Sequence, residues 1–436
     1  MSLLKIQGGN KLQGKIRISG SKNAGLAVLA GSIVCEKPIT FIGLPNIQDI
    51  YSMNNLLLDL GGKIVFDGTR ISEFGPDKTV EIIDNSNINK LVAEYDYVKK
   101  MRASFFTLGP LLARFKQAKV SLPGGCAIGA RGVDIHLDGL KAFGVKIDIV
   151  DGYVFASADN GLDGCEYTLP FASVGATENL ISVGILAKGT TILKNVAKEP
   201  NVIALIDFYN SIGAKISGKG TDILTIQGVK QEDLHSTTFI IPADNIEAGT
   251  YAIASAITDG EVLLTGCTML DFIGVKEIFE KIGIGLKEVD ETNKKGVLAY
   301  KLHDFIHCDI ETAVFPGFPT DLQAQMMIPL LLANGESKVI EKIFENRFMH
   351  VPELCRMGAN INVHGNTAML KGNTHFKSAN VMATDLRASA ALVLAGLIAE
   401  GETVIDRIYH LDRGYEKLEM KLNNCGAKII RSKSSL

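Results

Sequence analysis

Leu60-Gly61-Gly62-Lys63-Ile64 is one copy of the pattern that decides the fold of this chain. Each copy has an apolar residue or Cys, then Gly, and Ile or Leu three positions after the Gly. The six Gly residues stand at positions 61, 144, 213, 283, 358 and 426. Their separations of 83, 69, 70, 75 and 68 residues are nearly constant over the whole chain. This period predicts six copies of one supersecondary unit.

Each copy predicts the same order of elements. The Gly suits the position after a helix, where a left-handed backbone carries no Cβ penalty. A strand follows, and turn signals such as Asp151-Gly152 predict a hairpin. An amphipathic helix such as 202–211 precedes the Gly, and a more apolar, interior helix lies further upstream. The interior helices are predicted at 24–34, 102–113, 177–187, 246–257, 321–333 and 386–399.

The chain therefore reads as α/β, with six helix–strand–helix–hairpin units. Its 436 residues exceed the roughly 250–300 that one core supports, so two domains of three units each are expected. The break is predicted near 234–245. Residues 6–19 are predicted to be a strand pair around Gly8-Gly9-Asn10, and the sequence pattern does not assign them to a domain.

Composition excludes several classes of protein. With 46% hydrophobic and 21% charged residues, the chain is not a disordered one. A net charge of −3 argues against a general surface for nucleic acid or anionic membrane. The longest nearly apolar run, 388–399, is too short to span a membrane, and no signal peptide is expected. Seven scattered cysteines without a CxxC pair predict free thiols rather than disulfides or a zinc ribbon.

Polar clusters begin the interior helices. N-capping is the simple explanation for Ser173, Thr177 and Thr384. It does not explain Lys22, Arg102 or Arg387, because a cation at a helix N-terminus opposes the helix dipole. An anion bound over these residues would explain them, and capping with chance placement of the cations is the alternative.

Arginines and one cysteine in loops form a second set. Arg131, Arg347 and Arg413 could bind carboxylate or phosphate, or form ordinary surface ion pairs. Cys126 lies in a glycine-rich loop near Arg131, a setting that lowers a thiol pKa, or it is a loop cysteine without a role. His303, His307 and Cys308 lack a fourth ligand, so no metal is expected. No Walker or dinucleotide-binding motif is present.

Eight ordered motifs show a resemblance to a known family. They are Ser19-Gly20-Ser21-Lys22-Asn23-Ala24, Met101-Arg102-Ala103-Ser104, Leu122-Pro123-Gly124-Gly125-Cys126, Ser173-Val174-Gly175-Ala176-Thr177, Phe318-Pro319-Thr320-Asp321, Glu345-Asn346-Arg347-Phe348-Met349-His350, Ala383-Thr384-Asp385-Leu386-Arg387 and Asp412-Arg413-Gly414-Tyr415. Together they resemble the bacterial UDP-N-acetylglucosamine 1-carboxyvinyltransferases, which are enolpyruvyl transferases. The resemblance runs from about residue 3 to residue 430.

The resemblance implies a fold and a reaction. The fold is a two-domain inside-out α/β barrel, with residues 22–236 as the domain that carries Cys126, and residues 1–21 plus 237–436 as the domain that carries Asp321. The enzyme transfers the enolpyruvyl group of phosphoenolpyruvate to the 3-hydroxyl of UDP-N-acetylglucosamine and releases phosphate. This is the first committed step of peptidoglycan synthesis, with roles in cell shape and cell division. A cytoplasmic monomer without cofactor or metal, and without nucleic-acid or membrane partners, is expected.

The resemblance also assigns residues to roles. The implied catalytic residues are Cys126, Asp321, Lys22 and Arg413, with Cys126 as the acid, the site of a covalent phosphoenolpyruvate adduct and the target of fosfomycin. The implied phosphoenolpyruvate-binding residues are Lys22, Asn23, Arg131, Arg347, Arg387 and Arg413. The implied UDP-N-acetylglucosamine-binding residues are Asn23, Arg102, Arg131, Gly132, Val133, Asp134, Ile135, Phe171, Ala172, Ser173, Val174, Asp321 and Ile343.

Two departures and two alternatives accompany this assignment. Gly132 stands where the family usually has Pro, and Phe171-Ala172 where members often carry Lys or Pro. One alternative is the related synthase that makes enolpyruvylshikimate phosphate. The Leu-Pro-Gly-Gly-Cys and Glu-Asn-Arg-Phe-Met-His strings argue against it. The other is a non-catalytic regulator that binds UDP-sugars. The presence of Cys126, Asp321 and the named arginines argues against that one.

Overall fold

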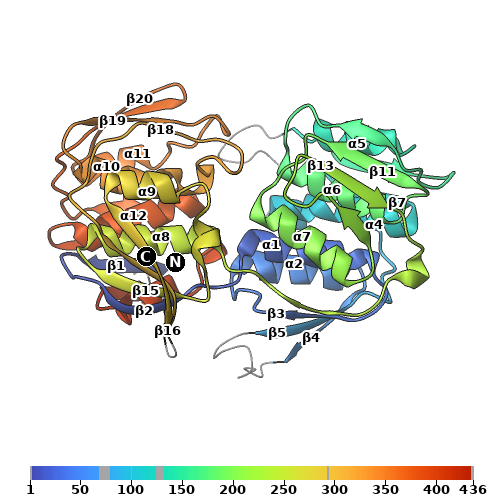
Figure 1. The fold of residues 1–436 in the computed structure, drawn as a ribbon, viewed down its shortest axis with the longest axis horizontal. Helices are drawn as coiled ribbons and strands as arrows, with labels where there is room; N and C mark the ends of the chain where they lie inside the picture. The colour runs from blue at the N-terminus through green and yellow to red at the C-terminus, as the bar shows by residue number, and fades with distance from the viewer. Residues whose placement is uncertain (1, 68–78, 100, 124–131, 292–293, 434–436) are drawn as a thin grey trace. The chain divides into compact units, whose positions relative to one another are not determined.

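The computed structural model describes residues 2–67, 79–99, 101–123, 132–291 and 294–433 (Figure 1). Contacts between them divide the chain into two compact bodies. We call the described residues of 20–242 lobe A, and those of 2–19 and 243–433 lobe B. The predicted domain bounds, 22–236 for one domain and 1–21 plus 237–436 for the other, stay a prediction.

Three of the predicted repeats build lobe A, each with a buried helix, a strand, a second helix and a hairpin. The helices are α1 (Lys22–Gly31), α2 (Gln48–Asp59), α3 (Tyr95–Val98), α4 (Leu108–Phe115), α5 (Asp134–Ala142), α6 (Val174–Ile185) and α7 (Pro200–Ser211), with 3-10 turns η1 (Ser32–Val34), η3 (Arg102–Thr107) and η4 (Gln231–Asp233). The strands are β3 (Ile39–Ile42), β4 (Lys63–Asp67), β5 (Val80–Asp84), β6 (Val92–Ala93), β7 (Gln117–Ser121), β8 (Lys146–Val150), β9 (Tyr153–Ser157), β10 (Glu166–Thr168), β11 (Thr190–Lys194), β12 (Lys215–Ser217), β13 (Ile223–Gln227) and β14 (Thr238–Ile240).

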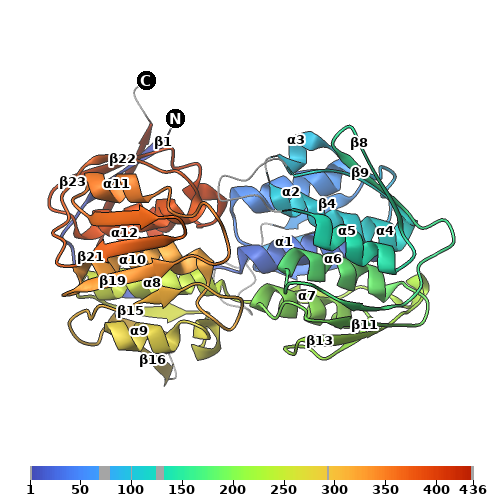
Figure 2. The same ribbon diagram turned by 90° about the horizontal axis from the view of Figure 1, so that it is seen from above.

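The strands of lobe A form three sheets of four strands. Their orders are β14-β3-β5-β4, β6-β7-β9-β8 and β10-β11-β13-β12. The first strand in each order pairs in parallel with the strand next to it. Strands β6 and β10 follow the hairpins of the first and second repeats, and β14 follows the hairpin of the third repeat. The three sheets are thus linked in a ring around the buried helices. Figure 2 shows α6 between β8 and β9 on one side and β11 and β13 on the other.

One buried carboxyl group in lobe A gives a pH-dependent stability. Glu178 on α6 is 2% exposed, and its Oε1 accepts a hydrogen bond from Asn201 Nδ2 at 2.7 Å. Burial raises the pKa of Glu178 from 4.5 to about 8. The folded state therefore keeps the proton that the unfolded chain releases, and stability falls as pH rises from about 4.5 to about 8, by roughly 1.4 kcal/mol per pH unit.

Glu178→Gln should remove this pH dependence because the amide cannot ionise. Urea unfolding at pH 5, 7 and 9 should show the variant gaining stability over the original protein as pH rises. Glu166→Gln is the matched control, because Glu166 is exposed on β10. A stability difference between Glu178→Gln and the original protein that stays constant with pH would contradict the prediction.

The other three repeats build lobe B from the same elements. The helices are α8 (Asn245–Ile257), α9 (Lys276–Ile282), α10 (Gln323–Leu332), α11 (Val351–Arg356), α12 (Leu386–Ile398) and α13 (Leu418–Asn423), with 3-10 turns η5 (Met269–Phe272), η6 (Thr320–Leu322) and η7 (Leu411–Arg413). The strands are β1 (Ser2–Gln7), β2 (Gln13–Arg17), β15 (Glu261–Thr265), β16 (Ile284–Glu291), β17 (Lys294–Lys301), β18 (Ile310–Glu311), β19 (Glu336–Ile340), β20 (Asn360–His364), β21 (Thr367–Lys371), β22 (Asn380–Met382), β23 (Glu402–Asp406) and β24 (Lys428–Lys433).

Lobe B also has three four-stranded sheets around three helices. The orders are β2-β15-β17-β16, β18-β19-β21-β20 and β22-β23-β1-β24. In Figure 1, β18, β19 and β20 lie on one side of α8, α10 and α12, and β1, β2 and β15 lie on the other. Helix α12 is buried from Arg387 to Leu397, as expected of a helix that is apolar nearly all round. The predicted class, α/β with helices inside and sheets outside, is confirmed.

The predicted strand pair at the N-terminus is only half right. Both strands form, but β1 pairs with β23 and β24, while β2 pairs in parallel with β15. The sixth repeat contributes β23 and β24, and β1 takes the place between them that the hairpin strand β21 takes in the fifth repeat. The two N-terminal strands therefore complete two different sheets of lobe B.

The six repeat glycines have the predicted backbone conformation. Their φ angles lie between 84° and 113°, in the left-handed region that only glycine adopts without a Cβ penalty. The Asp151-Gly152 turn between β8 and β9 has φ values of 51° and 76°, as a two-residue hairpin of type I′ requires. None of the described helices combines the length and the apolar character that a membrane span requires.

Candidate active site

Asp321 in lobe B lies between two buried arginines. Its Oδ1 accepts a hydrogen bond from Arg347 Nη2 at 2.8 Å, and its Oδ2 accepts from Arg387 Nη2 at 3.0 Å and Nε at 3.2 Å. The Asp321 side chain is 27% exposed, whereas those of Arg347 and Arg387 are 5% and 3% exposed. The cluster presents a carboxylate to solvent, with positive charge fixed behind it.

Local chain geometry places these three side chains. Asp321 is the second residue of η6, which Pro319 precedes and which leads into α10. Neither η6 nor α10 has a side-chain N-cap, so Asp321 does not cap the helix that it precedes. Arg387 starts α12, where Asp385 Oδ1 accepts from the backbone N–H groups of Arg387 and Ala388. Burial disfavours the charge of Arg387, but the Asp321 carboxylate outweighs this and raises the pKa of the guanidinium.

A buried polar network centred on Tyr415 packs against Arg387. The Arg387 guanidinium lies 5.5 Å from the centre of the Tyr415 ring. The Tyr415 hydroxyl hydrogen-bonds Thr250 Oγ1 at 2.9 Å and accepts from Gln325 Nε2 at 3.1 Å. Since Thr250, Gln325 and Arg387 come from α8, α10 and α12, this network ties the three central helices together. Arg413, two residues before Tyr415, ends η7 and is half-buried.

In lobe A, Lys22 pairs with a carboxylate that the sequence analysis did not select. Its Nζ lies 3.0 Å from Asp49 Oδ2, and their side chains are 12% and 3% exposed. Ser21 caps α1 by accepting a hydrogen bond from Ala24 N, and the half-buried Asn23 follows Lys22 in the first turn. A carboxylate of the chain thus offsets the charge of Lys22, as Asp321 does for Arg387. A bound anion over either cation stays a prediction.

Several of the residues implied for the UDP-sugar lie near α5 or α6 in lobe A. Arg102 Nη2 approaches Gly132 O at 3.5 Å, and the rings of Phe106 and His136 pack against Gly175 on α6. Burial, with Arg102 adding to it, lowers the pKa of His136 to about 3, so this imidazole is neutral. Val133 is buried, Asp134 is exposed and Ile135 is half-buried. Phe171 is 49% exposed beside the half-buried Ala172, and Val174 begins α6.

Two of the three predicted caps are wrong. Ser173 does cap α6 by accepting from Ala176 N. Thr177 lies inside α6, where its hydroxyl accepts from Ala197 N instead. At α12 the adjacent Asp385 provides the cap, and Thr384 Oγ1 has no hydrogen-bond partner within the described chain. A carboxylate one position nearer to the helix replaces the hydroxyl.

Cys126 and Arg131 lie outside the described residues. Of the other cysteines, Cys35, Cys267, Cys308 and Cys425 are buried, Cys165 is half-buried and Cys355 is exposed. Ile343 is half-buried, four residues before Arg347.

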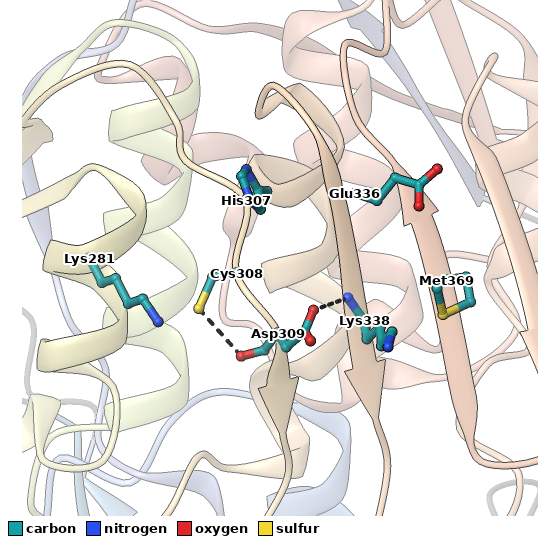
Figure 3. A pocket seen from close by; sticks show the side chains of 7 residues that line it. All are labelled: Lys281, His307, Cys308, Asp309, Glu336, Lys338 and Met369. Atoms are coloured by element: carbon teal, nitrogen blue, oxygen red, sulfur yellow. Dashed lines mark hydrogen bonds between the residues drawn. The ribbon is translucent and has the colours of Figure 1, made fainter.

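A hollow of about 450 Å³ occurs elsewhere on lobe B (Figure 3). It is lined by Lys281, His307, Cys308, Asp309, Glu336, Lys338 and Met369. His307 and His303 each place Nδ1 2.8 Å from a backbone carbonyl oxygen, that of Asn334 and that of Asp304. The described residues contain no group of three potential metal ligands. The hollow shares no lining residue with the Asp321 cluster.

Comparison with known proteins identifies the family. The model of the EPSP synthase (3-phosphoshikimate 1-carboxyvinyltransferase) family matches residues 6–422. The chain belongs to this family of enolpyruvyl transferases. The protein named UDP-N-acetylglucosamine 1-carboxyvinyltransferase in Dinoroseobacter shibae is 48% identical over 436 residues and covers 100% of both chains. The protein of the same name in Ruegeria pomeroyi is 47% identical over 433 residues, which are 99% of this chain and 100% of that protein. The predicted resemblance is confirmed.

Solved structures agree with the fold of this enolpyruvyl transferase. The enolpyruvyl transferase NikO from Streptomyces tendae superimposes with a TM-score of 0.88 at 24% identity, covering 99% of each chain. An EPSP synthase from Acinetobacter baumannii gives a TM-score of 0.76 at 18% identity, covering 99% of this chain and 100% of that one. At these identities the likeness concerns the fold alone.

Three residues that hold the charged groups of this enolpyruvyl transferase in place were not predicted as site residues: Asp49, Thr320 and Glu341. Asp49 had only the weak signal of an acidic residue in the first turn of a helix. Thr320 and Glu341 contact each other across 21 positions of sequence, with Thr320 Oγ1 donating to Glu341 Oε2 at 2.8 Å. Pairing over such a distance is set by the sheet and helix packing and leaves no local pattern.

Proposed function

We propose that this enolpyruvyl transferase moves the enolpyruvyl group of phosphoenolpyruvate to the 3-hydroxyl of UDP-N-acetylglucosamine and releases phosphate. The observation that carries the proposal is the carboxylate of Asp321, held at the surface of lobe B by two buried guanidinium groups. Full-length identity of 48% to a relative named for this activity supports it. On this proposal the protein is a monomer in the cytoplasm and performs the first committed step of peptidoglycan synthesis.

The proposed reaction needs an acid, a base and several cations. Protonation of the methylene carbon of phosphoenolpyruvate makes the neighbouring carbon electrophilic, and the sugar hydroxyl adds to it. The resulting tetrahedral ketal loses phosphate and one methyl proton, which restores the enol ether. Cys126 supplies the first proton in this scheme, and its thiolate can also add to phosphoenolpyruvate. Asp321 accepts the proton of the sugar hydroxyl.

The charge arrangement suits Asp321 to its proposed role. Arg347 and Arg387 donate hydrogen bonds to both carboxylate oxygens, which fixes the orientation of the carboxylate before substrate arrives. Lys22, Asn23, Arg131 and Arg413 complete the proposed phosphoenolpyruvate set.

Contacts within lobe A support part of the proposed UDP-sugar set. Arg102 Nη2 approaches Gly132 O at 3.5 Å, and the rings of Phe106 and His136 pack against Gly175 near the start of α6. Exposed Phe171 offers an apolar ring face suited to an aromatic base. Ile343 and Asp321, in lobe B, also belong to the proposed set.

Phosphate release with different acceptors tests the proposal against its alternatives. We expect rapid release from phosphoenolpyruvate with UDP-N-acetylglucosamine, and none with shikimate 3-phosphate or without an acceptor. Release only with shikimate 3-phosphate would favour an EPSP synthase. Binding of UDP-N-acetylglucosamine without release under any condition would favour a regulator. Sedimentation of the same sample tests the monomer.

A further inference from the structure

We infer that Glu341 is a positioning residue that fixes Arg347, and through it Asp321, for the reaction. The inference rests on the proposed function. Glu341 directly follows β19 and is 2% exposed, so its carboxylate has little access to water. A buried carboxylate is retained only where hydrogen bonds replace its hydration.

Four hydrogen bonds supply this replacement. Glu341 Oε1 accepts from Thr312 Oγ1 at 2.9 Å, from Ile343 N at 2.8 Å and from Phe344 N at 3.1 Å. Its Oε2 accepts from Thr320 Oγ1 at 2.8 Å. One carboxylate therefore joins the end of β18, the start of η6 and the loop that carries Arg347.

Two routes lead from Glu341 to Arg347. In the first, Thr320 Oγ1 donates to Glu341 and accepts from Arg347 Nη1 at 3.2 Å. In the second, the bond to Phe344 N fixes the residue whose ring centre lies 5.2 Å from the Arg347 guanidinium. Arg347 then donates to Asp321, the next residue after Thr320. Glu341 orients the Thr320 hydroxyl by accepting its hydrogen bond, which leaves the hydroxyl oxygen to accept from Arg347.

The isosteric variant Glu341→Gln separates the two routes. Its amide oxygen can still accept from Thr312, Ile343 and Phe344, but the amide nitrogen cannot accept from Thr320. Thr320→Val breaks the same link from the other end. We expect each variant to lower kcat by roughly 10- to 100-fold with a much smaller change in KM, because displacing a reacting group by about 1 Å costs about that much.

Three comparisons distinguish positioning from a general loss of structure. The double variant Glu341→Gln/Thr320→Val should lose about as much as either single variant, because both remove one link. Thr320→Ser keeps the hydroxyl and should recover most of the activity lost in Thr320→Val. Glu336→Gln, an exposed change at the other end of β19, should behave like the original protein.

The outcomes decide the inference separately from the proposed function. Near-normal kcat in Glu341→Gln and Thr320→Val, or losses that multiply in the double variant, would overturn the positioning role. If the original protein releases no phosphate, the proposed function fails. Hydrogen exchange at the Ile343 and Phe344 amides then decides the inference, since Glu341→Ala should accelerate exchange at both amides. Unchanged exchange would overturn it.

Discussion

Asp321→Asn should reduce turnover by roughly 10²- to 10⁴-fold, the usual contribution of a general base. The amide cannot take the proton of the sugar hydroxyl, although it keeps the size of the side chain. Steady-state phosphate release with UDP-N-acetylglucosamine and phosphoenolpyruvate measures the effect. Asp259→Asn is the matched control, because Asp259 is 71% exposed in the same lobe and its positive φ suits Asn.

The same variant should also lose stability, because Arg347 and Arg387 would remain buried with a weaker partner. Removing one member of a fully buried ion pair costs about 3–5 kcal/mol, and the partial exposure of Asp321 reduces this to roughly 1–3 kcal/mol. Melting and turnover therefore have to be measured on the same sample. Folded Asp321→Asn protein with nearly normal turnover would contradict the role as base and leave only a structural ion pair.

Alkylation of Cys126 should abolish activity, while the other cysteines contribute nothing to inactivation. Burial raises the pKa of Cys35 above its usual value, and those of Cys165, Cys267 and Cys425 to about 11, 12 and 11. Their thiols are therefore poor nucleophiles near pH 7. Among the described cysteines, only Cys355 is exposed. Fosfomycin should form a C–S bond to Cys126 as its epoxide C–O bond opens.

Peptide mapping and two variants test this second prediction. Cys355→Ser should be inactivated by fosfomycin at the original rate. Cys126→Asp should keep some turnover and resist the epoxide, because a carboxylic acid can donate a proton but is a weaker nucleophile. Inactivation that maps to any other cysteine would remove Cys126 from the mechanism.

The repeat pattern predicted the fold because its signals are local. A left-handed glycine after a helix and a nearly all-apolar helix are consequences of a few neighbouring residues. All six glycines and all six interior helices are therefore where the sequence placed them, within a few residues. The exceptions are at helix starts. The helix predicted at 102–113 begins as the 3-10 turn η3. At α12, Asp385 provides the N-cap that was predicted for Thr384.

The charged cluster could be predicted only in part. Basic residues at the starts of α1 and α12 predicted bound anions over them; the structure shows a carboxylate of the chain beside each, and a bound anion stays a prediction. The identity of each carboxylate, Asp49 for Lys22 and Asp321 for Arg387, depends on packing between segments 27 and 66 positions apart. The same holds for Glu341, whose four partners come from three separate segments. Contacts between segments so far apart in the sequence cannot be predicted from composition or from the spacing of motifs.

The place of β1 between β23 and β24 has a consequence for biosynthesis. Translation makes this strand before the other described strands, yet its partners β23 and β24 come after all of them, and Ser2 lies opposite Lys433 in the register. Until the last repeat emerges, Leu4 and Ile6, both fully buried in the finished protein, have no sheet to join. The nascent β1 segment must wait as an unpaired apolar segment until β23 and β24 have been made. A circularly permuted gene that joins the two termini and starts the chain after β1 would remove that wait.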